Sequence, residues 1–175
     1  MRQKLQRAGI ITVIILIACV IIFGWLFSNN NIGIPKSAII NNIRSSQEIS
    51  SDWTIVGEAS DKMAAYISYP ADYSDHIFSI YINRPGLSFG YFFRVGGSLS
   101  VVNQCISEYS IEGCGDRAFI SMNTQKVNRL EIDDGSSIRQ IDLDSNSPFA
   151  IVLPVNAGDV TFYDVSGNIV EWKKY

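Results

Sequence analysis

A serine, an aspartate and the only histidine of the chain occur side by side at Ser74, Asp75 and His76. These are the residue types of a hydrolytic triad, in which serine attacks, histidine moves the proton and aspartate orients the histidine. Neighbours on an extended segment point to alternate faces, however, and triads assemble side chains from distant parts of a chain. The sequence therefore predicts no catalytic residue here, and we expect His76 to lie at the surface or at a cap.

Two cysteines, Cys105 and Cys114, stand nine positions apart around the polar, glycine-ended sequence ISEYSIEG. A disulfide between them would close a loop of about ten residues and constrain the unfolded chain by roughly 2.7 kcal/mol. Their spacing matches neither Cys-x-x-Cys nor a zinc pattern. We expect a structural disulfide, with two reduced thiols as the alternative because many cell envelopes lack efficient oxidation. The third cysteine, Cys19, lies in an apolar segment and serves as filler.

Oxygen-bearing side chains alternate at Asp142, Asp144 and Asn146, as they do at the start of an EF-hand calcium loop. The sixth loop position is Ser147 rather than glycine, and the twelfth is Leu153 rather than glutamate. No P-loop, dinucleotide fingerprint or His-Glu-x-x-His motif occurs either. We therefore expect no metal site and no cofactor.

The most distinctive stretch is aromatic and rich in glycine, and it covers residues 81–97. Its even positions carry Phe92 and Arg94 beside the bare Gly90, and an exposed aromatic ring next to an arginine is typical of a recognition surface. In the alternative interpretation Phe92 packs on a second sheet, and Gly90 marks a bulge or makes room for a close neighbour. The odd positions, which we expect to face the core, are Leu87, Phe89, Tyr91, Phe93 and Val95.

The elements that would hold these residues begin with an uncharged run of twenty residues, 8–27, of which seven are isoleucine. A helix of this length spans roughly 30 Å, the thickness of a bilayer's hydrocarbon core. Three basic residues precede the run and none follows it until Lys36. The positive-inside rule then predicts a cytoplasmic tail at 1–7, a transmembrane helix at 8–27 and an extracytoplasmic remainder.

Two other interpretations of the apolar run stay open. A cleaved signal peptide is one, although the run exceeds the usual 7–15 residues and no small-x-small cleavage site follows it. The other is a pilin-like assembly subunit, because Arg7-Ala8-Gly9-Ile10 resembles the leader of that family. The resemblance departs at Ile14, where the family usually carries glutamate, and residues 29–35 interrupt the helix that the family continues.

Beyond the apolar run, residues 28–175 suffice for one hydrophobic core. We expect a linker with a short juxtamembrane helix at 28–52, the helix covering 35–47, and a β-domain at 53–175. Residues 28–175 hold 11 basic and 17 acidic side chains, which gives them a net charge of −6. That charge disfavours direct adhesion to anionic lipid or teichoic-type polymers. The net charge of the whole chain, −3, excludes a nucleic-acid partner held by phosphate neutralisation, and 47% hydrophobic residues exclude a disordered chain.

From Trp53 onward apolar residues alternate with period two, in runs of about 5–8 residues separated by turn-forming sequences. This pattern predicts a mainly β fold, an antiparallel sandwich or a curved sheet, that ends in a hairpin over 159–175. No strand–helix–strand rhythm occurs, which excludes a parallel doubly wound sheet.

These features together favour a single-pass membrane protein of the cell envelope with a non-enzymatic β-rich binding or accessory module outside the membrane. Its expected partners are the lipid bilayer, through residues 8–27, and an envelope protein. An assembly subunit and, less strongly, a membrane-anchored hydrolase are the alternatives.

Overall fold

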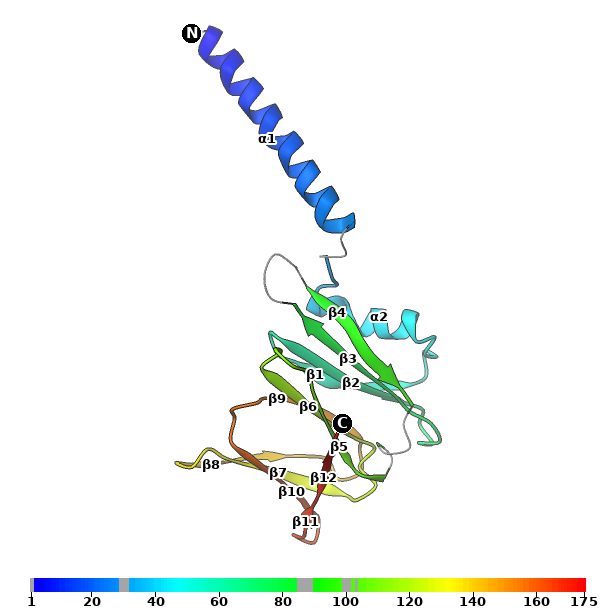
Figure 1. Ribbon diagram of the computed structural model, residues 1–175. Coiled ribbons are helices and arrows are strands. Elements are labelled where there is room, and N and C mark those ends of the chain that lie inside the picture. Colours follow the sequence, from blue (N-terminus) through cyan, green and yellow to red (C-terminus); the bar gives the residue numbers. More distant parts are fainter. Residues whose placement is uncertain (1, 29–31, 85–89, 99–101, 103) are drawn as a thin grey trace.

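A computed structural model describes residues 2–28, 32–84, 90–98, 102 and 104–175 (Figure 1). The first element, α1 (Arg2–Ser28), includes part of the expected tail as well as the apolar run. In the described chain one helix, over Gly9–Leu26, is long and apolar enough to cross a membrane. Its large side chains from Ile10 to Trp25 are more than half exposed. A membrane anchor and a signal sequence both have this length and composition.

A second, short helical segment follows, as the sequence predicted for 35–47. It begins as a 3-10 turn, η1 (Lys36–Ala38), and continues as α2 (Ile39–Ser46). Ile39 and Ile43 are fully buried, because they lie on the one face of α2 that rests on the first sheet.

Twelve strands in the described chain form three sheets of four strands each. The first sheet has the order β1-β2-β3-β4: β1 (Thr54–Ala59), β2 (Met63–Tyr69), β3 (Ile77–Asn83) and β4 (Tyr91–Gly97). The middle sheet has the order β12-β5-β6-β9: β12 (Trp172–Lys174), β5 (Ile106–Ser110), β6 (Asp116–Ser121) and β9 (Phe149–Pro154). The outer sheet has the order β11-β10-β7-β8: β11 (Ile169–Val170), β10 (Asp159–Asp164), β7 (Val127–Asp133) and β8 (Ile138–Asp142).

The mainly β class is confirmed, and its layers follow the order α2, first sheet, middle sheet, outer sheet (Figure 1). Neighbouring strands pair antiparallel except β12, which pairs parallel with β5. Because the middle sheet lies between the first and the outer sheet, both of its faces are covered. Strand β9 shows why: Ala150 and Val152 pack toward the first sheet, and Phe149, Ile151 and Leu153 toward the outer one. A continuous apolar run is typical of such a doubly buried strand.

Two segments differ from the sequence expectation. The stretch between the cysteines, expected to be a polar excursion, contains β5, whose residues 106–109 are buried. The predicted hairpin over 159–175 forms only between β10 and β11. Strand β12 then leaves the outer sheet and joins the middle one, because Trp172 packs on Phe119 there at a ring distance of 5.6 Å.

Candidate functional site

Strand β4 lies at the edge of the first sheet and contains a β-bulge. Its partners on β3 are Phe93 for Tyr81 and Val95 for Ile80, so that Arg94 is the extra residue. A bulge interrupts the alternation of side chains. Tyr91 is buried as expected, whereas Phe93 and Val95, also expected in the core, are 47% and 37% exposed. Leu87 and Phe89 lie outside the described residues.

Beneath β4 two adjoining hollows form what we call the β4 groove. The first has a volume of about 210 Å³ and is lined by Ile82, Arg84, Phe92, Arg94, Ile111 and Glu112. The second has about 380 Å³, shares Ile82, Arg84 and Glu112 with the first, and extends to the β1–β2 and β5–β6 turns. We refer to them as the Phe92 end and the Lys62 end.

The Phe92 end brings together two of the three predicted recognition residues. Phe92 and Arg94 line the same hollow. The Arg84 guanidinium lies 4.1 Å from the centre of the Phe92 ring, a cation–π contact that holds both side chains in place. Arg84 was not singled out from the sequence, because its place opposite Phe92 depends on the pairing of β3 with β4.

The third predicted residue, Gly90, has a different role. Its φ is +87°, and a Cβ there would lie 2.6 Å from the Ile34 carbonyl oxygen. This close approach permits a two-residue bridge in which the Ile34 and Tyr91 N–H groups each donate to the other's carbonyl, at 2.9 and 2.8 Å. Gly90 thus makes room for the segment that follows α1, in agreement with the alternative interpretation.

The Lys62 end contains Cys114 and the side chain of Lys62, which lies over Gly115. The Cys114 thiol is 3.7 Å from the Lys62 carbonyl oxygen and donates to it. Burial raises the pKa of the Cys114 thiol above its ordinary value. A protonated thiol is a poor nucleophile, so the geometry favours a structural role for Cys114.

A partly buried polar network formed by Tyr91, Ser60 and Asp116 lies next to the Lys62 end of the groove. The Tyr91 hydroxyl donates to the Ser60 carbonyl, and the Ser60 hydroxyl donates to Oδ2 of Asp116 at 2.5 Å. The same hydroxyl oxygen accepts from the N–H groups of Lys62 and Met63, at 3.0 and 2.9 Å. Burial raises the pKa of Tyr91. The network ties β4, the β1–β2 turn and β6 into one frame.

The cysteines of the expected disulfide lie at opposite ends of a hairpin. Cys105 directly precedes β5, and Cys114 lies in the turn between β5 and β6. The length of β5 separates them by about 16 Å at 3.3 Å per residue, whereas a disulfide needs a Cα separation of about 4.4–6.8 Å. Both belong to the described chain, and the structure does not join them.

Ser74 and Asp75 make contacts other than those of a triad: the Ser74 hydroxyl donates to Asp72 at 2.7 Å, and Asp75 accepts from the backbone N–H of His76 at 2.7 Å. His76 is 5% exposed rather than at the surface, and it stands at the start of β3. Residues 86–90 also spell Gly-x-Ser-x-Gly, a motif of hydrolase nucleophiles that the sequence reasoning missed. That motif works between a strand and a helix, whereas the described strands on either side of it in the sequence, β3 and β4, pair antiparallel. Residues 85–89 themselves lie outside the described chain.

The turn at residues 142–147, considered above as a calcium site, uses its carboxylate for hydrogen bonds within the turn. Asp144 accepts from the Asn146 N–H at 2.9 Å and from the Ser147 hydroxyl at 2.7 Å, which lowers the pKa of its carboxyl group. Within the described residues, no group of three or more His, Cys, Asp or Glu side chains is arranged to hold a metal ion.

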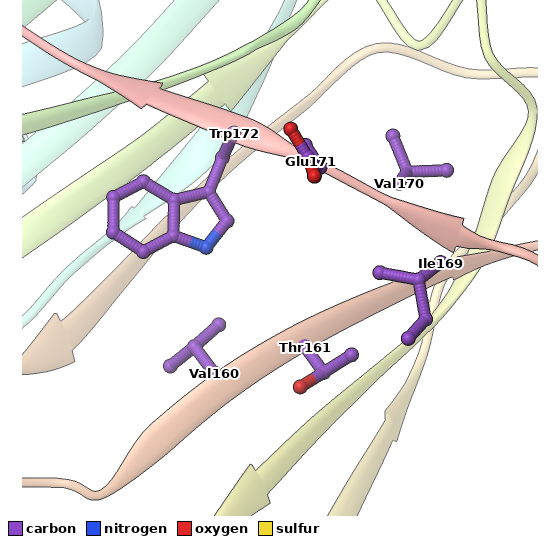
Figure 2. A pocket seen from close by; sticks show the side chains of 6 residues that line it. All are labelled: Val160, Thr161, Ile169, Val170, Glu171 and Trp172. Carbon is purple, nitrogen blue, oxygen red and sulfur yellow. The ribbon is translucent and has the colours of Figure 1, made fainter.

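A further hollow of about 310 Å³ lies where β10, β11 and β12 meet (Figure 2). Its walls are mostly apolar, with Glu171 as the one carboxylate among the lining residues: Val160, Thr161, Ile169, Val170, Glu171 and Trp172. It brings together no acid–base or nucleophilic pair. The β4 groove, with its arginines and aromatic ring, is chemically the richer site.

No known protein-family model, curated protein or solved structure matches this chain.

Proposed function

We propose that this chain is a single-pass membrane protein whose β-rich domain lies outside the membrane and acts as a non-enzymatic binding module of the cell envelope. In this proposal α1 is retained as the anchor, residues 1–7 are cytoplasmic, and the β4 groove is the recognition site.

The anchor part is supported by exposure. The large apolar side chains from Ile10 to Trp25 are more than half exposed, for example 60% for Ile10 and 71% for Val20, so the rest of the protein does not cover them. Twenty uncharged residues without a polar face would be strongly destabilised in water and stabilised in lipid. The basic residues before the apolar run favour the orientation with a cytoplasmic amino terminus.

The binding part depends on one observation: an arginine stacked on an aromatic ring, with a second arginine beside it, lines an open hollow at a sheet edge. Arginine and aromatic side chains dominate the binding energy of protein interfaces. The hydrogen bonds from Tyr91 to Ser60 and from Ser60 to Asp116 hold the strand that carries them, so binding costs little free energy for ordering that strand.

Photo-crosslinking in intact cells tests the binding part. The aromatic crosslinker p-benzoylphenylalanine is placed at Phe92 and, as the matched control, at Ile138, which is 64% exposed on β8. We expect a discrete adduct at Phe92 that is absent at Ile138 and lost when Arg94→Glu is added. Equal labelling at both positions, or labelling indifferent to Arg94, would contradict the proposal.

Mass spectrometry of the membrane-extracted chain tests the anchor part. We expect the amino-terminal segment to be intact and the chain to resist alkaline extraction from membranes. A mature amino terminus at Ile10 would instead identify the pilin-like alternative, and cleavage beyond residue 27 a secreted protein. Both results would overturn the retained anchor.

A further inference from the structure

We propose that the occupant of the β4 groove is an acidic peptide segment of a partner protein, one that carries a carboxylate beside an apolar side chain. This inference rests on the proposed function and names the chemistry of its ligand.

Charge supports an acidic occupant. The groove holds three basic side chains, Lys62, Arg84 and Arg94, although residues 28–175 have a net charge of −6. Two arginines elsewhere in the domain are paired with carboxylates, Arg117 with Glu108 and Arg129 with Glu131. Arg94 is exposed and takes part in neither. An arginine fork binds a carboxylate through two parallel hydrogen bonds, which Arg94 is placed to offer.

A uniform polyanion fits the groove poorly. Glu112 lies at the junction of the two hollows, and Asp61 lines the Lys62 end. These carboxylates would repel a polymer that carries a negative charge on every repeat unit. Glu112 can, however, accept a hydrogen bond from the N–H of a peptide. A segment with one or two acidic residues therefore suits the groove better than polyphosphate or a teichoic-type polymer.

A sugar ring is also disfavoured. Sugars dock on the open faces of aromatic rings, and Arg84 lies over a face of Phe92 at 4.1 Å. The other walls of this end, Ile82 and Ile111, offer a contact to an aliphatic side chain instead. The combination of arginine with apolar walls favours a peptide over an acidic glycan.

Direct binding to the full chain in a neutral detergent tests this inference. The probes are a fluorescent hexapeptide in which two glutamates each stand beside a valine, its glutamine and lysine counterparts, and an oligogalacturonate. We expect the glutamate peptide to bind at least about tenfold more tightly than the glutamine peptide. Its affinity should fall as salt rises from about 0.05 to about 0.5 M, because the contacts are at the surface.

Charge reversal separates recognition from folding. Arg94→Glu should lose the glutamate peptide and gain the lysine peptide, an exchange that an unfolded variant cannot produce. Arg139→Glu, the matched control on exposed β8, should bind as the unmodified chain does. Equal effects of the two variants would overturn the inference.

The remaining outcomes distinguish the inference from the function beneath it. If the oligogalacturonate binds in an Arg94-dependent way and the peptides do not, the groove remains a recognition site and the peptide assignment is wrong. If no probe binds and the Phe92 crosslinker captures nothing in cells, both proposals fail.

Discussion

Glu108 of β5 and Arg117 of β6 face each other in the interior, with Nη1 of the arginine 3.8 Å from Oε2 of the glutamate. The side chain of Glu108 is 3% exposed and that of Arg117 13%. Arg117 also donates from Nη2 to the Gly158 carbonyl at 3.0 Å, and Glu108 accepts from the Ser110 hydroxyl at 2.8 Å. The pair therefore joins the middle sheet to the β9–β10 turn.

Removing one member of this pair should cost more than removing both. Arg117→Met leaves the Glu108 carboxylate buried without its counter-charge, and we expect unfolding to become easier by about 3–5 kcal/mol. Adding Glu108→Gln should restore part of that loss. Urea denaturation of the full chain in neutral detergent measures both, with Arg139→Met as the exposed control. Additive losses would contradict a coupled pair.

Asn123 is a second buried polar residue with a large expected effect. Its amide donates to the carbonyls of Val127, Asp144 and Ser147 at 3.0–3.1 Å, and its Oδ1 accepts from the Val127 N–H at 2.7 Å. We expect Asn123→Ala to destabilise the fold by about 2–4 kcal/mol.

The backbone part of that effect can be separated. Because φ of Asn123 is +56°, Asn123→Gly should be more stable than Asn123→Ala by about 1 kcal/mol, the reverse of their usual order in regular structure. Thermal denaturation compares the two, and an alanine variant as stable as the glycine variant would contradict the left-handed conformation.

Gly90 should be far less replaceable than Gly135. Both have positive φ, +87° and +83°, but a Cβ at Gly135 meets nothing within 4 Å, whereas one at Gly90 meets backbone atoms of Ile34 and Gly33. Gly135→Ala should cost about 1–2 kcal/mol of backbone strain. Gly90→Ala should cost more and open the Ile34–Tyr91 bridge, seen as faster hydrogen exchange at those two amides only in the Gly90 variant.

The turn at Asp134 should make stability fall in acid. Hydrogen bonds from the Ser136 hydroxyl and from the N–H groups of Ser136 and Ser137 lower its pKa to about 2. A depressed pKa in the folded state stabilises the fold above the unfolded value, near pH 4, and that contribution is lost as pH falls toward 2.

Carbon NMR of the carboxyl groups tests the cause of this shift. Ser136→Ala should raise the pKa of Asp134 toward its ordinary value. The pKa of Asp164, which is lowered by its own hydrogen bonds from Asn168, should stay where it is. An unchanged Asp134 in the variant would show that the serine does not cause the shift.

The sequence pattern predicted the positions of many strands but little of how the strands pack together. Period-two alternation predicted β2, β3 and β9, and the pairing of Phe92 with Arg94 on one face held in spite of the bulge. The bulge itself is a tertiary feature, so the exposure of Phe93 and Val95 was not predictable from alternation. The burial of β5 was not predicted for a related reason. A glutamate such as Glu108 indicates an exposed position unless a partner from another strand, here Arg117, pairs with it in the interior.

The bridge between Ile34 and Tyr91 also determines how the domain would respond to mechanical load. A pull along α1 reaches the first sheet at its edge strand β4, where it loads the two hydrogen bonds of the bridge between Ile34 and Tyr91. Those two hydrogen bonds would break first, ahead of the buried contacts of Ile39 and Ile43. The segment between α1 and α2 would then act as an extensible linker that lengthens under tension while the three stacked sheets stay intact.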